Sequence, residues 1–323
     1  MSFQSYIKNC DCFDEFQNIP DGIVDLVCVD LPYGQTACEW DIPIDLNKMW
    51  IELKRISKLN TIYIFFCTTI FGYELIKSNP KLFKYDLVWE KSKVLGFLSS
   101  KKLPLRKHEM IYIFSASNID TEVEHNLELR EYSKKVKNYI NKSVKEINKV
   151  IGCDGIDHFF RHSSSQFSMP TKKTYNKLIE YYCIDKMEGF LDYDTMITKN
   201  EQRRTYNPQM KKGKPFKVKE HLAGRNMVYG NIIVPAKQNE SGDRYPTSII
   251  KFNNEFKTIH PTQKPIDLLE WLIKTYSNEN DIVLDFTMGS GTTIKACKNT
   301  NRKYIGIEKD KDIFILAKDR IEN

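Results

Sequence analysis

The tetrapeptide Asp30-Leu31-Pro32-Tyr33 directly follows an apolar run, residues 23–29. The run predicts a buried strand, so the tetrapeptide falls at a strand's carboxyl end, where open α/β sheets keep their ligand sites. A carboxylate, a carbonyl constrained by a proline ring and an aromatic face suit a planar substrate with an amino group, such as a nucleobase. A string this short more often forms only a capped turn with its tyrosine packed on the core. The motif therefore needs support from elsewhere in the chain.

A second motif lies near the other end of the chain. A strand-like segment with an apolar centre, residues 281–286, runs into a glycine turn, residues 287–293, which opens a helical segment. The glycines let backbone approach a ligand, and the helix start offers unpaired N–H groups and a positive dipole end. The next strand-like run ends in Glu308, about twenty residues on, where an acid can hold ribose hydroxyls. The dinucleotide fingerprint G-x-G-x-x-G is incomplete, because Ile294 stands where the third glycine belongs.

Composition sets the frame for both motifs. With 323 residues and 41% hydrophobic content, the chain can form one large domain or a catalytic domain with a substantial insertion. The net charge of +7 favours a polyanionic partner, although solvated lysines give many cytosolic proteins the same balance. No apolar run approaches the roughly 18 residues of a membrane span, and the amino terminus lacks a signal pattern. We therefore expect a cytoplasmic protein with no membrane partner.

The eight cysteines are scattered along the chain. Cys28 and Cys67 lie inside apolar runs, where a thiol behaves as a small buried hydrophobe. No C-x-x-C pair is present, so the sequence predicts neither a zinc site nor another metal site. A reduced chain without metal is expected.

Periodicity divides the chain into three parts, residues 1–115, 116–259 and 260–323. In the first and last parts, strand-like runs alternate with helical patterns, which predicts an α/β fold with a mostly parallel sheet. The predicted strands are residues 23–29, 61–66, 85–89, 110–114, 282–286 and 304–307, and helices are predicted around Met49 and Leu53, after Pro265 and at the end of the chain.

The middle part is richer in charged helical patterns and polar loops. Ser143-Val-Lys-Glu146 reads as a capping box, and Thr171 precedes a second helix, so two helices with a polar connection predict a helix-turn-helix-like unit. The alternative is a solvated helical hairpin. The predicted DNA contacts are Arg161, His162, Ser164 and Gln166 in the connection, Lys172 in the second helix, and Lys211 and Lys212 in a later basic cluster.

In their order, these motifs resemble the beta class of amino-group DNA methyltransferases, which use S-adenosylmethionine. That class places an Asp/Ser/Asn-Pro-Pro-Tyr motif early, a target-recognition region in the middle and Phe-x-Gly-x-Gly late, a circularly permuted order that this chain matches over nearly its whole length. Further agreement comes from Asp11-Cys12, Trp89-Glu90-Lys91, Arg106-Lys-His-Glu109 and His260-Pro-Thr-Gln-Lys-Pro265.

The resemblance implies a Rossmann-like, mostly parallel methyltransferase sheet. Residues 1–115 would be its catalytic half, 116–259 a target-recognition region with a basic helical insertion, and 260–323 its cofactor-binding half. Two positions depart from the family pattern. Leu31 replaces the usual proline, and Thr287-Met288 stands where many members have a single residue before the first glycine.

The resemblance also assigns roles. Asp30 and the Pro32 carbonyl would accept hydrogen bonds from an exocyclic amino group, and Tyr33 would stack on the flipped-out base. The methionine moiety of the cofactor would lie among residues 285–291 and Lys264. The implied cofactor-binding residues are Asp11 and Cys12 at the adenine, Glu308 at the ribose, and Asp30, Lys264, Asp285, Phe286, Gly289, Ser290, Gly291 and Thr292 around the rest.

Three residues beside these motifs are treated differently. His108 and Glu109 are assigned to structure, since Glu109 opens a strand and resembles a family position that orders the sheet. His260 precedes a proline, where a histidine is as often structural as functional.

The predicted activity is methylation of adenine N6 in double-stranded DNA. Cytosine N4 is the alternative target, because a serine in place of Asp30 is more usual among cytosine enzymes but the rule is not strict. Methylation of RNA or of a glutamine side chain is disfavoured by the motif order. A DNA-binding regulator with an inactive methyltransferase fold and a dinucleotide oxidoreductase are the remaining alternatives. A homodimer and a restriction endonuclease partner are compatible with the family.

Overall fold

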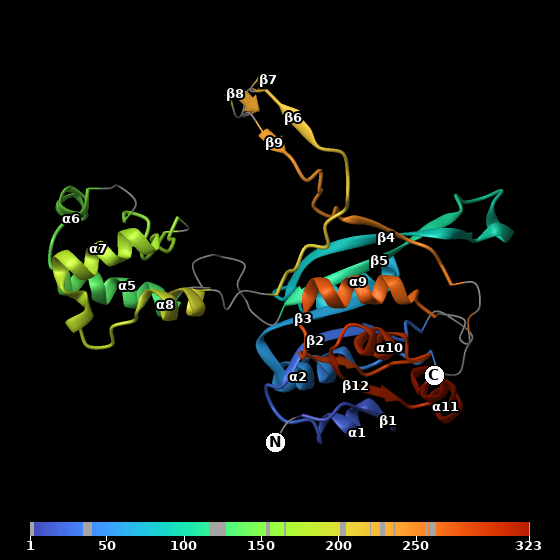
Figure 1. Cartoon of the computed structure of the whole chain (residues 1–323). Coiled ribbons are helices and arrows are strands. Elements are labelled where there is room, and N and C mark those ends of the chain that lie inside the picture. The colour runs from blue at the N-terminus through green and yellow to red at the C-terminus, as the bar shows by residue number, and fades with distance from the viewer. Residues whose placement is uncertain are drawn as a thin grey trace. The chain divides into compact units, whose positions relative to one another are not determined.

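The computed structural model describes residues 3–34, 41–115, 127–152, 156–164, 166–200, 205–219, 221–226, 230–234, 237–255, 258 and 263–322. The chain forms two compact units: a helical unit, Ser115–Arg204, and a sheet unit built mainly from the segments before and after it (Figure 1). His260 and the region of the predicted His-Pro motif before Gln263 lie outside the described residues.

The sheet unit contains an eight-stranded sheet in the order β1-β12-β11-β2-β3-β5-β4-β10. Its strands are β1 (Tyr6–Asn9), β2 (Val24–Asp30), β3 (Ser57–Cys67), β4 (Phe83–Leu95), β5 (Arg106–Ser115), β10 (Ile249–Phe252), β11 (Ile282–Asp285) and β12 (Lys303–Glu308). The pairs β1/β12, β12/β11, β11/β2, β2/β3 and β4/β10 are parallel, whereas β4/β5 is antiparallel. The predicted α/β fold with a mostly parallel sheet is confirmed.

Helices cover both faces of this sheet. They are α1 (Cys12–Phe16), α2 (Leu46–Ile56), α3 (Thr69–Ser78), α9 (Ile266–Tyr276), α10 (Thr292–Asn299) and α11 (Lys311–Glu322). Strand β3 contacts the helices on both faces, because successive side chains of a strand point to opposite faces of the sheet. Ile62 and Ile64 belong to a cluster with α9, while the rings of Tyr63 and Phe65 lie 5.5 and 5.6 Å from that of Trp50 in α2.

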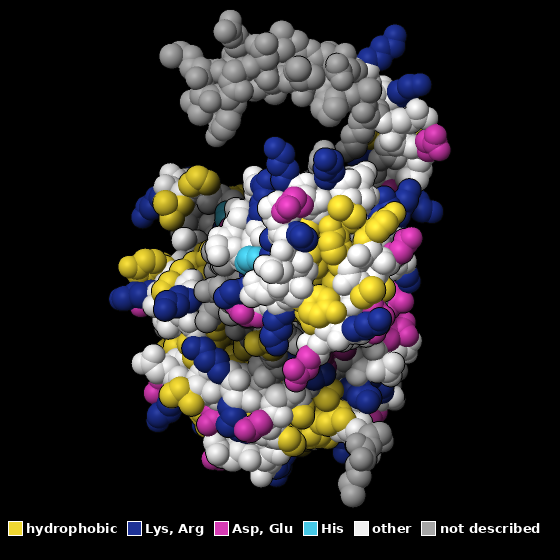
Figure 2. Space-filling view, turned by 90° about the vertical axis from the view of Figure 1, so that its left-hand side faces the viewer, with side chains coloured by type: hydrophobic (Ala, Val, Ile, Leu, Met, Phe, Trp, Pro, Cys, Tyr) yellow, Lys and Arg dark blue, Asp and Glu magenta, His cyan; other side chains and the backbone are white. Residues whose placement is uncertain are grey.

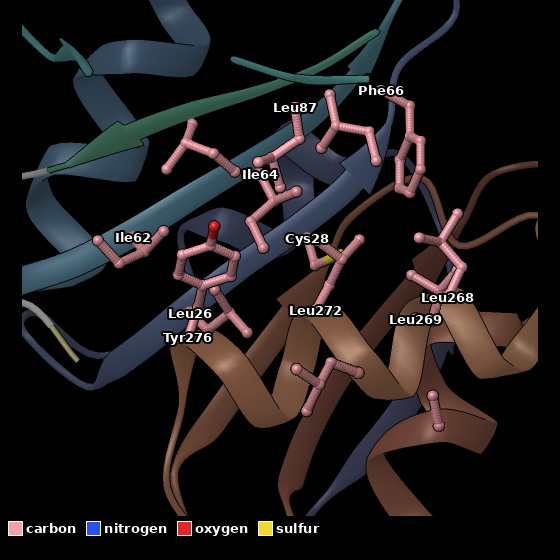
Figure 3. Close-up of a cluster of buried hydrophobic side chains, with 14 of the residues drawn as sticks. Leu26, Cys28, Ile62, Ile64, Phe66, Leu87, Leu268, Leu269, Leu272 and Tyr276 are labelled. Carbon is pink, nitrogen blue, oxygen red and sulfur yellow. The ribbon is translucent and has the colours of Figure 1, made fainter. Parts of the chain in front are cut away.

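The core between α9 and the sheet is fully apolar in its centre (Figure 3). Helix α9 contributes residues at helical spacing, and β2, β3 and β4 contribute residues that point to the same face. The labelled members are Leu26, Cys28, Ile62, Ile64, Phe66 and Leu87 from the strands, and Leu268, Leu269, Leu272 and Tyr276 from the helix. The prediction that Cys28 and Cys67 behave as buried hydrophobes is confirmed, since both are fully buried.

Two parts of the sheet were not predicted. Strand β1 is short and half-exposed, so it lacks an apolar signature. Strand β10 pairs in parallel with β4 at the sheet edge, and it lies within the predicted target-recognition region, residues 116–259. The middle region, residues 116–259, is therefore divided between the two units. The part up to Arg204 belongs to the helical unit, and the part from Thr205 belongs to the sheet unit.

The helical unit has its own hydrophobic core, built from α5 (Leu127–Ile140), α6 (Val144–Ile151), α7 (Lys172–Tyr182), the short η2 (Ile184–Lys186) and α8 (Tyr193–Asn200). The predicted capping box is present: the Ser143 hydroxyl accepts from the Glu146 N–H, and the Glu146 carboxylate accepts from the Ser143 N–H. Thr171 caps α7 as predicted. Residues 152–171 connect the two helices, whereas a DNA-binding helix-turn-helix has a turn of about 3–4 residues.

Residues 205–246 include two small antiparallel ladders that the sequence analysis did not predict. Strand β6 (Phe216–Val218) pairs with β9 (Lys237–Asn239), and β7 (His221–Asn226) pairs with β8 (Gly230–Val234). Lys211 and Arg244 form a further bridge between the two ends of this segment.

On the face shown in Figure 2, Lys and Arg side chains are spread among hydrophobic and acidic ones rather than gathered in one stripe. Within the described ranges, no helix is long and apolar enough to cross a membrane. The same residues contain no cluster of three or more His, Cys, Asp or Glu suited to a metal ion.

Candidate active site

A pocket of about 740 Å³ lies at the carboxyl ends of β2, β11 and β12. Both predicted motifs line it, although 255 positions (285 − 30) separate Asp30 from Asp285 in the sequence. The predicted site residues among its walls are Asp11, Cys12, Asp30, Pro32, Tyr33, Lys264, Asp285, Phe286, Gly289, Ser290, Thr292 and Glu308. The two motifs meet because β2 and β11 pair in parallel, which places the carboxyl ends of both strands at the same edge of the sheet.

The loop after β2 is held against the glycine turn. The Thr287 hydroxyl donates to the Asp30 carbonyl at 3.1 Å. Leu31, the departure from the family pattern, is only 2% exposed, so its side chain serves the core. Pro32 and Tyr33 remain on the pocket wall, and the Tyr33 ring lies 5.0 Å from that of Phe71 in α3. The substitution at Leu31 therefore leaves the polar groups of the motif in the pocket.

Both carboxylate oxygens of Asp30 have partners. The Tyr33 hydroxyl donates to Oδ1 at 2.5 Å, and the Lys264 ammonium forms an ion pair with Oδ2. Burial raises the pKa of the Asp30 carboxyl, against the attraction of Lys264. Burial by itself would lower the pKa of Lys264, but the carboxylates of Asp30 and Glu109 raise it above its ordinary value. Lys264 is therefore a permanent cation at the Asp30 end of the pocket.

Glu109 extends this arrangement into a buried charge network. Its carboxylate lies 3.2 Å from the Lys264 ammonium and 2.5 Å from the ammonium of Lys91. Burial by itself would raise the pKa of Glu109, but Lys264 and Lys91 together lower it. The sequence analysis assigned Glu109 to structure only. The available signal was its place next to the apolar run that begins at Met110, where a buried acid needs a cationic partner.

The glycine turn between β11 and α10 depends on two left-handed residues, Gly289 at φ +48° and Gly291 at φ +70°. A Cβ on Gly291 would also meet Ile321 of α11 at 2.8 Å. Met288 in this turn is buried, and its N–H donates to the carbonyl of Ile307 in β12 at 3.0 Å. The turn is therefore anchored to the neighbouring strand.

Glu308 lies at the end of β12, beside the turn. Its carboxylate accepts from the N–H groups of Gly289 and Asp310, both at 2.9 Å. Burial raises the pKa of Glu308, while these N–H groups oppose the rise. Asp11 caps α1 by accepting from the Phe13 N–H at 2.9 Å and pairs with Lys309 at 3.0 Å. This end of the pocket thus offers carboxylate oxygens that can accept from hydroxyl groups.

Asp285 is the most buried acid of the site. It is 3% exposed at the end of β11, and burial raises the pKa of its carboxyl to about 7, against hydrogen bonds from Thr293 and from the Thr287 N–H. A carboxyl with this pKa exchanges its proton readily near neutrality. It can therefore become charged when a cation arrives in the pocket.

The predicted DNA contacts fall in two different units. Arg161, His162, Ser164 and Gln166 share the connection between α6 and α7, and Lys172 begins α7 and pairs with Asp194 at 3.0 Å. Lys211 and Lys212 are exposed residues of the sheet unit. The first five belong to the helical unit, and the last two belong to the sheet unit.

The connection is anchored by a buried arginine that the sequence analysis missed. Arg130 of α5 is 3% exposed and donates to the carbonyls of His162 and Ser164 at 2.6 and 2.9 Å. Its guanidinium lies 4.5 Å from the Phe167 ring. At the surface, Arg161 donates to the Gln166 side chain. The backbone at His162 and Ser164, next to these exposed side chains, is therefore held by Arg130.

The fold and the pocket together define an α/β protein of the Rossmann-like methyltransferase class. A family model described as DNA methylase, of the N6/N4 methyltransferases, matches residues 24–319. The chain belongs to this family. A solved structure, the cytosine-N4-specific PvuII DNA methyltransferase, shares the fold with a TM-score of 0.51 and 10% identity, over 99% of this chain and 87% of that one.

Relatives in bacteria carry related names. The Type II methyltransferase M1.MboII of Moraxella bovis is 24% identical over 314 residues, which are 94% of this chain and 90% of that protein. The orphan methyltransferase M.BamHII of Bacillus amyloliquefaciens is 31% identical over 50% of this chain and 60% of its own length. The Type II methyltransferase M.HpaI of Haemophilus parainfluenzae is 45% identical over 24% of each protein. Local matches such as the last thus span about a quarter of the relatives' length.

Proposed function

We propose that the protein is a DNA methyltransferase that moves a methyl group from S-adenosylmethionine to the exocyclic N6 of an adenine flipped out of duplex DNA. The observation that carries the proposal is the single pocket in which Asp30, Pro32 and Tyr33 face the glycine turn and Glu308. Membership of the N6/N4 DNA methylase family supports the reaction class. The acid at position 30 favours adenine over cytosine by resemblance.

The walls of the pocket fit the cofactor. Gly289 at positive φ lines the pocket without a side chain, and the buried carboxyl of Asp285 suits the cofactor's ammonium group. Glu308 suits the ribose hydroxyls, and Asp11 with Cys12 lies on the same wall for the adenine ring. When bound, S-adenosylmethionine supplies an electrophilic methyl group on a sulfonium.

The residues at the other end prepare the acceptor. An exocyclic amino nitrogen is a poor nucleophile while its lone pair is delocalised into the ring. Asp30 and the Pro32 carbonyl accept its hydrogen bonds and draw it towards tetrahedral geometry, and Asp30 receives or passes on the proton that the nitrogen loses. Tyr33 stacks on the base, which is worth about 1–3 kcal/mol against the cost of flipping. Alignment of acceptor and methyl group accounts for most of the rate gain.

The direct test is methylation of plasmid DNA by the purified protein, followed by modification-aware sequencing and nucleoside analysis. We expect N6-methyladenine at one short sequence. If methylcytosine is the only product, the target is cytosine N4 and not adenine N6. Cytosine N4 is the alternative target, and the PvuII methyltransferase, which shares the fold, is a cytosine-N4-specific enzyme. Cofactor binding without modification of any DNA would contradict the proposed substrate. Calorimetry that compares binding of S-adenosylmethionine with binding of NAD tests the oxidoreductase alternative, which requires binding of NAD.

Cofactor affinity is expected to depend on pH through Asp285. Since its pKa is about 7, the carboxyl is mostly protonated at pH 6 and must ionise to pair with the cofactor's ammonium. The Kd for S-adenosylmethionine should be about tenfold higher at pH 6 than at pH 8, with proton release on binding at pH 6. Calorimetry in two buffers of different ionisation enthalpy measures both. Asp285→Asn should bind weakly with no such pH dependence, and equal wild-type affinities at the two pH values would refute the assignment.

DNA affinity is expected to depend on Arg161. We propose that Arg161 exchanges its bond with Gln166 for a phosphate or a base edge. Arg161→Ala should weaken DNA binding several-fold and lower the slope of log K against log salt by about 1, with unchanged cofactor affinity. Lys186→Ala, an exposed cation of the same unit outside the connection, is the control. If both variants bind DNA alike over a salt titration, Arg161 is no DNA contact.

A further inference from the structure

Strands β4 and β5 form a long antiparallel hairpin, which remains paired as far as Leu95 and Arg106 after an irregularity beyond Glu90. The tip of the hairpin, residues 94–105, includes the short helix η1 (Phe97–Ser99), which Gly96 begins at φ +88°. All its residues are exposed, and Phe97 and Leu98 are 77% and 103% exposed. Folding of this chain gains nothing from such side chains in water, and adjacent exposed apolar residues mark an interaction site.

The charge of the hairpin indicates the kind of partner. Residues 91–107 contain six Lys or Arg and no Asp or Glu. Lys91 and Lys107 form ion pairs with Glu109 and Glu90 at the base, while Lys93, Lys101, Lys102 and Arg106 lie nearer the tip. An apolar point flanked by cations complements duplex DNA, whose phosphates attract the cations and whose base steps accept apolar wedges. A second copy of this chain is a poorer match, because its net charge is +7.

The position of the hairpin strengthens the match. A chain of ion pairs runs from its base to the candidate catalytic acid: Lys91 to Glu109, Glu109 to Lys264, and Lys264 to Asp30. The hairpin therefore leaves the sheet at the same edge as the pocket. At about 3.3 Å per residue, the six residues from Lys91 to Phe97 span at most about 20 Å. A duplex that delivers a base to the pocket would lie within reach of the tip.

We propose that the hairpin tip is a DNA-contacting wedge. Phe97 and Leu98 enter the base stack next to the flipped-out nucleotide and occupy the gap it leaves, while Lys101 and Lys102 contact phosphates. The proposal rests on the proposed function, since it presumes that a base leaves a duplex to reach the pocket. It adds an element outside the pocket that lowers the cost of flipping.

The test compares two tip variants with the wild-type protein on a duplex containing the methylated sequence. Phe97→Ser/Leu98→Ser should lower kcat/KM for DNA by about 10–100-fold and abolish the fluorescence rise of 2-aminopurine placed at the target, which reports flipping. A duplex with the target opposite an abasic site, where flipping is easier, should restore most of the rate. Lys101→Gln/Lys102→Gln should instead lower the salt slope of binding by about 2, without rescue by the abasic site.

Controls separate this proposal from the function on which it rests. Ile315→Ser/Leu316→Ser removes an exposed apolar pair on α11 and should behave as wild type. A wild-type protein that neither binds nor methylates duplex DNA would overturn both proposals. Normal methylation with tip variants equal to wild type would overturn only the wedge. The wedge proposal would also be overturned if the only defect of a tip variant were loss of a dimer in sedimentation, or loss of binding to anionic phosphatidylserine vesicles.

Discussion

Asp30→Ala is expected to lower kcat for methyl transfer by about three orders of magnitude while the Kd for S-adenosylmethionine changes by less than about threefold. In the proposed mechanism the Asp30 carboxylate is the charged acceptor, and without it the amino group of the base would keep its planar, weakly nucleophilic form. The cofactor groups at Asp285 and Glu308 lie on other strands, β11 and β12, and are left in place. Single-turnover methylation and calorimetry measure the two quantities.

Asp45→Asn is the matched control for Asp30→Ala. Asp45 lines the same pocket and caps α2 by accepting from the N–H groups of Asn47 and Lys48. Asparagine caps a helix as well as aspartate does, so this variant removes one negative charge from the pocket without loss of stability. We expect near wild-type kcat. Methyl transfer retained by Asp30→Ala would remove Asp30 from the mechanism, and a loss shared by both variants would point to pocket charge in general.

Lys264→Met is expected to abolish activity and to lower the free energy of unfolding at pH 7 by about 3–5 kcal/mol. Lys264 is the cation between Asp30 and Glu109, and its side chain is only 11% exposed. Without it, Glu109 keeps Lys91, whereas the largely buried carboxylate of Asp30 loses its cation and keeps, among the residues that the structure describes, the Tyr33 hydroxyl. Chemical denaturation monitored by tryptophan fluorescence measures the loss.

Two comparisons test the electrostatic cause of that loss. In Lys264→Met, burial without a cation raises the pKa of Asp30 further, so the folded state favours its protonated form. The deficit should therefore shrink as pH falls from 8 to 5, because protonation removes the unpaired charge. Lys264→Met/Asp30→Asn should regain most of the stability and remain inactive. If the double variant is no more stable than the single one, lost packing rather than unpaired charge explains the effect.

Local patterns in the sequence were sufficient for many elements of this fold. The run before Asp30 predicted β2, the helical spacing around Trp50 predicted α2, and the capping residues Ser143 and Thr171 predicted where α6 and α7 begin. Each signal involves neighbours a few residues apart, so it is readable without knowledge of the rest of the chain. The order of the two pocket motifs added the family and therefore the expectation that they would meet.

Contacts between distant segments could not be predicted in this way. Asp30 and Lys264 are 234 positions apart, and nothing in either local sequence shows that Glu109 and Lys91 complete their charge network. Edge strand β10 is four residues long, too short for a periodic pattern, and only its pairing with β4 defines it. From the sequence alone, Phe97 and Leu98 would be predicted to lie in the core, as most Phe and Leu residues do. Only the tertiary structure shows that they are exposed, because they lie at the tip of a hairpin that projects past the sheet.

The sequence by itself determined that this protein has an α/β sheet with an acid-aromatic motif at one strand end and a glycine turn at another, because strand periodicity and turn chemistry are local. Only the tertiary structure decided how these groups act together. It joined Asp30 through Lys264 to Glu109, buried Asp285 deeply enough to raise its pKa to about 7, and placed the base of a basic hairpin beside the pocket. Burial and charge pairing depend on which segments meet, and that is a property of the folded chain.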